Sequence, residues 1–198
     1  MDNCVGILMT GAQAGVWYLE TLQQKARLSR GRSTYVLPVK TLTVPFEDIN
    51  LFLPDNMHMA ASRILPYFRE MNVMGVSRYI LANITLHEAF DLVSDQIHGN
   101  GLLHLREIIR EVFDHKINIM LVGSMYTMKG TYLSGLFTRS PVTIVEADEA
   151  TQRELDHLRK LFIRARITKK LHWSLPGFWQ DILKSIDLCW LAPSMLWL

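Results

Sequence analysis

The sequence predicts an α/β protein built on parallel sheets, and three observations lead to that class. Apolar runs of strand length occur at 4–10, 73–82 and 117–122. Each run ends at glycine, hydroxyl or amide residues, and residues with helical periodicity follow. Strands that alternate with helices are typical of a parallel sheet with helices on both faces, in one unit or in two.

The chain is long enough for two lobes. Its 198 residues can form one domain or two small lobes that share a core. The stretch at 98–101, with the sequence HGNG, interrupts a helical pattern, so we place the lobe boundary there. We therefore expect an N-terminal α/β lobe at 1–98 and a C-terminal α/β lobe at 99–198.

Composition and charge argue against several classes of partner. The chain has 21 Lys and Arg against 19 Asp and Glu, which gives no electrostatic reason to expect nucleic acid or a membrane surface. Cys4 and Cys189 lack the spacing of a zinc site or a redox pair, and the seven histidines do not cluster in sequence. With no signal-peptide pattern and no apolar run of roughly 18 to 20 residues, we expect a cytoplasmic protein without a metal site.

In the first half, the spacing predicts a strand at 4–10 and a helix after the loop Gly11–Gly15. The basic stretch 25–32 is typical of a helix end, where cations favour the dipole, followed by a turn. Residues 33–39 predict an outer strand, because a proline within them suits a sheet edge. The other elements expected here are a loop at 44–56 and a helix at 57–71, with Asp55 or Asn56 as its cap.

The strand at 73–82 runs directly into a predicted helix start. Thr85 and Glu88 fit a capping box, in which each side chain satisfies a backbone N–H of the first turn. Free N–H groups at such a corner suit a carboxylate or a phosphate. The elements expected after this point are the helix to about Ile97, a short extended piece at 102–105, a helix to about Asp114, strands at 117–122 and 142–145, and a helix from Asp148 or Glu149 to about Ile167.

Three predicted strand ends carry hydroxyl or amide groups next to a glycine or a helix start. They are Thr10–Gly11, Asn83 with Thr85, and Gly123–Ser124 with Thr127. In a parallel sheet all three would lie at the same edge, where ligands bind. None of these loops has the GxGxxG or GxxxxGK[ST] spacing of a nucleotide site.

The motifs in these loops resemble those of the aspartate/glutamate racemase superfamily. The stretch 82–87 is similar to the family's Ala-Cys-Asn-Thr-Ala-His motif, and 121–124 with Thr127 is similar to its Leu-Gly-Thr-x-x-Thr loop. The opening strand at 5–11 resembles the family's first strand, and 186–189 weakly resembles its Leu-Gly-Cys-Thr-Glu strand end. The resemblance implies two flavodoxin-like lobes with a ligand cleft between them, a homodimer, and chemistry without a cofactor.

The sequence departs from the family where the chemistry occurs. The resemblance implies two cysteines, of which one removes the α-proton and the other returns a proton to the opposite face. Asn83 stands at the first cysteine position, and an amide cannot act as that base. Cys189 stands at the second position, and His87 is an alternative base. From the resemblance we also expect a C-terminal lobe that is shortened compared with the family.

We therefore expect a racemase-like isomerase that acts on a small carboxylate or an acidic amino acid, with the two-cysteine mechanism impaired. A catalytically silent relative that binds a carboxylate or a protein partner is an alternative, and a one-cysteine decarboxylase is another. The candidate catalytic residues are Cys189 and His87. The candidate substrate-binding residues are Thr10, Gly11, Gln13, Asn83, Thr85, Gly123, Ser124 and Thr127.

Overall fold

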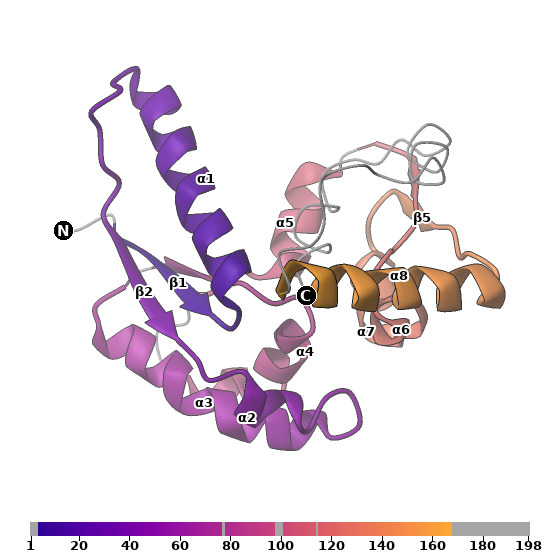
Figure 1. Ribbon diagram of the computed structural model, residues 1–198. Coiled ribbons are helices and arrows are strands. Elements are labelled where there is room, and N and C mark those ends of the chain that lie inside the picture. Colours follow the sequence, from indigo (N-terminus) through magenta and orange to yellow (C-terminus); the bar gives the residue numbers. More distant parts are fainter. Residues whose placement is uncertain (1–3, 77, 98–100, 114, 168–198) are drawn as a thin grey trace. The chain divides into compact units, whose positions relative to one another are not determined.

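The structure is a computed structural model, and it describes residues 4–76, 78–97, 101–113 and 115–167. The described residues form two compact units, one up to Glu107 and the other from Ile108 onward (Figure 1). Each unit is described by itself. The lobe boundary expected between 98 and 99 lies among residues outside the described ranges and stays a prediction.

The first unit is built on a parallel sheet, as predicted. Strand β1 (Val5–Met9) lies in the centre, between β2 (Val39–Thr43) and β3 (Arg78–Leu81), and both pairings are parallel. A parallel bridge from Tyr79 to Leu102 continues the sheet beyond β3. The expected extended piece at 102–105 is therefore reduced to a single bridge, because α5 already begins at Leu105.

Helices pack on both faces of this sheet (Figure 1). Ile7 of β1 packs with Ala14 of α1, whereas the neighbouring Gly6 faces Met71 of α3. That alternation follows from the two-residue repeat of a strand. The helices of this unit are α1 (Ala12–Arg30), α2 (Glu47–Asn50), α3 (Met57–Val73), α4 (Leu86–Asp91), the 3-10 helix η1 (Ser94–Gln96) and α5 (Leu105–Val112), which runs into the second unit.

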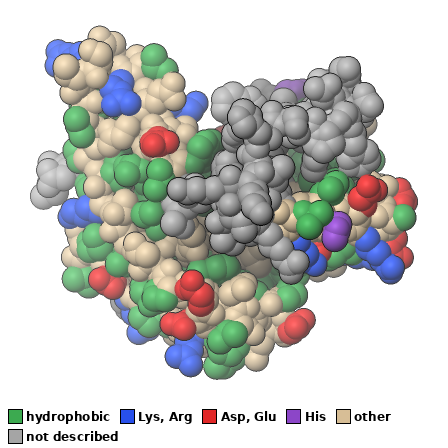
Figure 2. All heavy atoms as spheres, in the orientation of Figure 1, with side chains coloured by type: hydrophobic (Ala, Val, Ile, Leu, Met, Phe, Trp, Pro, Cys, Tyr) green, Lys and Arg blue, Asp and Glu red, His purple; other side chains and the backbone are tan. Residues whose placement is uncertain are grey.

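Local sequence signals explain where α1 and α3 begin and end. Gly31 ends α1 with a left-handed φ of 60°. At this cap the carbonyl of Leu28 accepts the N–H of Gly31, and the carbonyl of Arg27 accepts the N–H of the next residue. The basic residues expected at a helix end lie in this last turn, and Figure 2 shows Lys and Arg side chains at that end of α1. Asn56 caps α3 as predicted, because its side chain accepts the N–H of Met59 at 3.1 Å.

The second unit has a separate two-stranded parallel sheet. Asp148 caps its longest helix, since its carboxylate accepts the N–H of Thr151 at 3.0 Å, and this confirms the predicted helix start. The elements of this unit are β4 (Ile117–Ile119), α6 (Met125–Lys129), α7 (Thr131–Leu136), β5 (Val142–Ile144) and α8 (Glu149–Ile167).

Two predicted elements of the first unit are displaced. The outer strand expected at 33–39 is wrong, because β2 begins at Val39, directly after Pro38. Proline has no N–H to donate to a strand ladder. The side chain of Gln23, on α1, forms hydrogen bonds with the carbonyl and the N–H of Leu37, the residue before this proline, at 2.8 and 2.9 Å. The loop expected at 44–56 contains α2.

No helix in the described part of the chain is long and apolar enough to cross a membrane. The elements expected beyond residue 167 lie outside the described residues.

Candidate functional site

Two of the three predicted strand ends meet at the carboxyl edge of the first sheet. The hydroxyl of Thr10, just after β1, donates to the carbonyl of Ala82, just after β3, at 3.4 Å. The N–H of Ala82 in turn bonds the carbonyl of Leu8 at 3.2 Å. Thr10 is 3% exposed and Asn83 is 4% exposed. The sheet therefore brings the two strand-end side chains together, as its parallel order requires.

Asn83 starts α4 in place of the predicted capping box. Its side-chain oxygen accepts the N–H of Leu86 at 3.3 Å, whereas Thr85 makes no capping hydrogen bond through its side chain. The capping-box prediction is wrong because Thr85 already has helical angles, φ −62° and ψ −34°, and a capping residue is normally extended. The capping side chain is therefore that of Asn83, two residues before the Thr85 that the motif predicts. Since the oxygen of Asn83 is occupied, its NH2 group is the donor that this side chain offers to a ligand.

The start of α1 lies at the same edge. Gly11 precedes the helix with an extended backbone, and no side chain caps the first turn, which also contains no acidic residue. A side chain built at Gly11 would meet no atom within 4 Å. The N–H groups of the first turn of α1 are therefore available to an anion. Thr85, which follows β3, is half-buried. The side chain of Gln13 lies outside the described residues.

His87 is buried next to this edge, with an exposed fraction of 5%. Its Nδ1 accepts the N–H of Leu105 at 3.3 Å, and its ring stands edge-on to His104 with centroids 4.9 Å apart. The pKa of His87 is lowered to about 3, mainly by burial and also by the neighbouring His104, while a hydrogen bond to the carbonyl of Leu81 acts in the opposite direction. His87 is therefore neutral at physiological pH, and its catalytic role stays a prediction.

His104 is the ring partner of His87, and the sequence analysis did not predict this contact. Nδ1 of His104 accepts the N–H of Arg106 at 3.0 Å, and Nε2 lies 3.2 Å from a carboxylate oxygen of Asp91. Asp91 also pairs with Arg106 at 2.8 Å. Burial lowers the pKa of His104, while Asp91 works in the opposite direction. The signal that could have found His104 is its place just before an amphipathic stretch, which is the position of a helix cap.

The third predicted strand end lies in the second unit. Ser124 caps α6, since its Oγ accepts the N–H of Thr127 at 3.2 Å and lies 3.0 Å from the hydroxyl of Thr127. A side chain at Gly123 would approach Cγ2 of Thr127 to 2.9 Å, so this loop is closely packed. It follows β4, which belongs to the second sheet. The expectation that all three loops share one sheet edge is therefore wrong, and the cleft between lobes stays a prediction.

Two further expectations concern cysteine and metal chemistry. Cys189 lies outside the described residues, so its relation to Asn83 stays a prediction. Among the described residues, no group of three or more His, Cys, Asp or Glu side chains could hold a metal ion.

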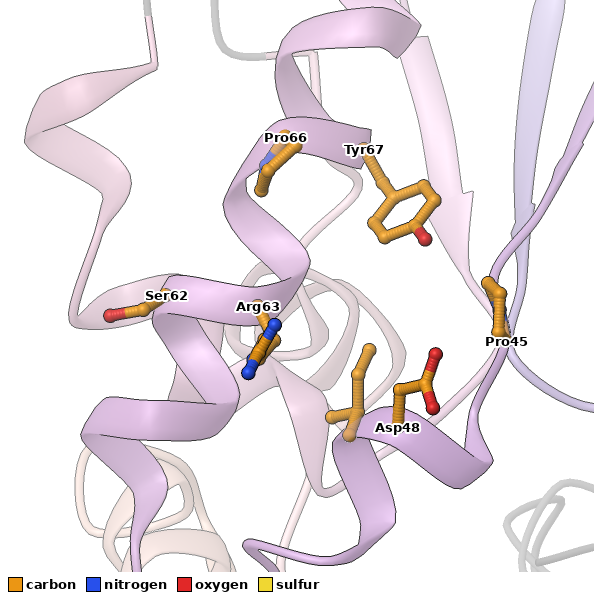
Figure 3. Close-up of a pocket in the computed structure, with 7 residues that line it drawn as sticks. Pro45, Asp48, Ser62, Arg63, Pro66 and Tyr67 are labelled. Carbon is orange, nitrogen blue, oxygen red and sulfur yellow. The ribbon is translucent and has the colours of Figure 1, made fainter.

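The structure has a surface hollow that the sequence did not predict. Its volume is about 260 Å³, and it lies between α3 and the segment that follows β2. Figure 3 shows Arg63 and Tyr67 of α3 on one side and Asp48 and Pro45 on the other. None of the predicted site residues lines it. The lining residues are Pro45, Asp48, Ile49, Ser62, Arg63, Pro66 and Tyr67.

The first unit thus has the architecture of an α/β protein with a parallel sheet. The strand ends carry the hydroxyl of Thr10 and the amide of Asn83, next to the uncapped start of α1. Three solved structures share the fold. A candidate Asp/Glu racemase from Yersinia pestis aligns with a TM-score of 0.67 and 17% identity, over 80% of this chain and 70% of that one. An aspartate racemase homologue from Pyrococcus horikoshii OT3 gives 0.65 and 12%, over 85% and 82%. Aspartate racemase from Picrophilus torridus gives 0.56 and 16%, over 80% and 68%.

At this level of identity the likeness establishes the fold. The chain has the two-lobed α/β fold of aspartate/glutamate racemases, which confirms, for the fold, the resemblance found in its motifs. No family model matches the chain, and no curated protein matches it significantly.

Proposed function

We propose that this chain is a divergent member of the aspartate/glutamate racemase superfamily, and that it binds a small carboxylate at the carboxyl edge of β1 and β3. One observation carries the proposal. Thr10 and Asn83 lie together at the edge where parallel sheets bind ligands, beside the uncapped start of α1. The three solved structures with this fold support the same reading, because their names describe racemases or racemase homologues.

The chemistry of this edge suits a carboxylate. It offers the NH2 group of Asn83 and the backbone N–H groups of α1 as donors, next to the positive end of the helix dipole. Hydrogen-bond donors at the positive end of a helix favour an anion over a cation. The ligand class that we propose is therefore an acidic amino acid or a dicarboxylate.

The activity that we propose for this site is a racemase-like isomerisation of the bound carboxylate. Its two-thiol form cannot operate, because Asn83 replaces the first thiol and an amide does not abstract a proton. Cys189 is the remaining thiol at a motif position. Its use in a one-cysteine decarboxylation stays a prediction, as do the homodimer, the cytoplasmic location and the absence of a cofactor.

A second candidate function is carboxylate binding without turnover. A specific observation favours it: the polar side chains at this edge already have structural roles. Asn83 caps α4, Thr10 bonds the carbonyl of Ala82, and both ring nitrogens of His87 take part in hydrogen bonds to the backbone. The acceptor nitrogen of His87, the candidate base at this edge, is therefore occupied at neutral pH.

Calorimetry with L-aspartate and with succinate tests the binding site. Asn83→Asp keeps an oxygen to cap α4 but adds a negative charge, so we expect binding to weaken about tenfold or more. Thr10→Val removes the hydroxyl at nearly constant volume and should also weaken binding. Thr41→Val, on an exposed position of β2 in the same sheet, is the matched control and should bind like the wild type. Equal binding by Asn83→Asp and the wild type would contradict the proposed site.

Deuterium exchange at the α-carbon separates the two functions. Isomerisation predicts that the wild type washes α-deuterium out of aspartate or glutamate, which proton NMR detects. Binding without exchange supports the second candidate. Asn83→Cys restores a thiol at the first cysteine position, and under either function we expect it to exchange faster than the wild type. If neither protein exchanges and neither ligand binds, both proposals are wrong.

A further inference from the structure

The first turn of α5 is capped by two imidazole rings. The N–H of Leu105 donates to Nδ1 of His87 at 3.3 Å, and the N–H of Arg106 donates to Nδ1 of His104 at 3.0 Å. The first N–H groups of a helix have no partner within the helix. Here two of them are satisfied by side chains from different places, one on α4 and one immediately before α5.

An imidazole cap differs from the usual hydroxyl or carboxylate cap in its response to protons. Nδ1 accepts a hydrogen bond only while the ring is neutral, because both ring nitrogens of a protonated histidine are donors. A proton on Nδ1 of His87 would therefore face the N–H of Leu105 with another N–H. The positive charge would also stand at the positive end of the helix dipole, which adds an unfavourable interaction.

The groups that surround the two rings define the electrostatics of this cap. On α4, Asp91 lies 3.2 Å from Nε2 of His104 and favours its cation, as does Glu107 on α5, whereas Arg106 opposes it. His104 opposes a charge on His87, whereas a hydrogen bond to the backbone of His87 favours a charge on His104.

Two other elements present neutral groups to this pair of rings. From β3, the carbonyl of Leu81 accepts a hydrogen bond from His87. From α3, Phe68 packs edge-on against Phe90 of α4, which lies next to His104. Asp91, Glu107 and Arg106 are thus the charged side chains that act on His104.

We propose that His87 and His104 form a proton-sensitive cap, which holds the first turn of α5 on α4 at neutral pH and releases it in acid. The release would also free the carbonyl of Leu81, at the end of β3, from its hydrogen bond with His87. The cap therefore links the carboxyl edge of the first sheet to the start of α5. Because the surroundings of both rings disfavour the cation, the release lies below the ordinary histidine range of about pH 6.5.

Hydrogen exchange of individual amides tests this cap in the full-length protein. Between about pH 7 and about pH 4.5, we expect the protection factors of the Leu105 and Arg106 amides to fall about tenfold or more. At the lower pH the amides of Ile7 and Leu8, in the central strand, should stay better protected than those of α5, because they open only when the whole unit unfolds. Unchanged protection of α5 at the lower pH overturns the proposal.

A double variant, His87→Asn with His104→Asn, gives the matched comparison. The side-chain oxygen of asparagine can replace Nδ1 as an acceptor, but it does not take up a proton in this range. We expect this variant to lose the pH response of α5, while His157→Asn, on an exposed position of α8, should respond like the wild type. An equal fall in protection in the double variant and the wild type overturns the proposal.

Nitrogen NMR of the wild-type imidazoles decides the matter if the double variant does not fold. The cap requires both rings to carry their proton on Nε2 at neutral pH, because Nδ1 is the acceptor in each. Chemical shifts of the Nε2–H form at both residues support the proposal. An Nδ1–H form at either residue overturns it.

Discussion

At Gly6 the backbone of β1 lies so close to its neighbours that any side chain would collide with them. A Cβ there would lie 2.7 Å from Sδ of Met71, 2.8 Å from Cβ of Tyr79 and 2.8 Å from Cγ1 of Val76. Tyr79 is the register partner of Gly6 on β3, so its Cβ cannot move without the strand. The absence of a side chain at Gly6 is what allows α3 to approach the sheet.

Gly6→Ala should therefore lower the free energy of unfolding by about 1 to 3 kcal/mol, the usual cost of overpacking a core. Urea unfolding measures this change. Gly135→Ala is the control, because a Cβ at Gly135 meets nothing within 4 Å and the residue lies inside α7. We expect that control to be neutral or slightly stabilising. A Gly6→Ala protein as stable as the wild type would show that β1 and α3 are less closely packed than described.

The two buried histidines also make the stability of the whole protein depend on pH. The pKa of His87 is about 3 in the folded state, against 6.5 in an unfolded chain, and the pKa of His104 is lowered as well. Below pH 6.5 these two histidines bind protons more readily in the unfolded chain than in the folded protein. The contribution of these two histidines to the free energy of unfolding is therefore constant above pH 6.5 and decreases as the pH falls below 6.5.

We expect each histidine to add a slope of at most about 1.4 kcal/mol per pH unit to the free energy of unfolding below pH 6.5. Urea unfolding at several pH values between about 7.5 and 4.5 measures the slope. His87→Asn should reduce it, and His58→Asn, exposed at the start of α3, should leave it unchanged. The same slope in wild type and His87→Asn would exclude His87 as its source.

At the scale of elements, the sequence predicts those whose signals are local. The helices α3 and α8 begin at Asn56 and Asp148, where a capping side chain precedes an amphipathic stretch. Strands β1 and β3 fall within predicted apolar runs. In each case the residues that decide the structure are neighbours along the chain, so periodicity and cap chemistry are sufficient.

Elements decided by distant residues were not predicted correctly. The residues before β2 have high strand propensity but are held by Gln23 of α1, which no local pattern reveals. The contacts of His104 with His87 and with Asp91 likewise depend on the packing of α4 against the start of α5. Local propensity is a weak prior where tertiary contacts supply the hydrogen bonds.

The cap of α3 gives a prediction at this scale. Asn56→Ala removes the acceptor for the N–H of Met59 and should lower the free energy of unfolding by about 1 kcal/mol. Asn56→Asp keeps an acceptor and adds a charge favourable to the helix start, so it should retain full stability. Chemical denaturation of both variants measures the difference. Equal stability of the alanine and aspartate variants would mean that this cap contributes nothing.

For the whole molecule, the alternation of strands and helices was enough to predict parallel sheets, and the resemblance of the loop motifs predicted the racemase-like fold. It was not enough to assign strands to sheets. The loop at Gly123–Ser124 was expected beside Thr10 and Asn83, yet it follows a strand of the second sheet. Two of the three strand ends of the candidate site could thus be grouped from sequence, because β1 and β3 belong to one unit and pair directly.

The first unit contains its own sheet, its helices and its buried core, so it should fold without the rest of the chain. A fragment of residues 1–113, which includes all of α5, should unfold cooperatively in urea with helical circular dichroism. Its amide spectrum should retain the resonances of β1 and β3 seen in the full chain. A fragment that shows neither a cooperative transition nor dispersed resonances would contradict this division of the chain.

The two hydrogen bonds between the side chain of Gln23 and the backbone of Leu37 have a consequence for self-association. β2 lies at the border of its sheet, and such borders recruit strands from other molecules through unsatisfied backbone groups. The amide of Gln23 occupies the N–H and the carbonyl of Leu37 together, much as a neighbouring strand would. A single side chain from α1 thus blocks the addition of another strand to the sheet at Leu37.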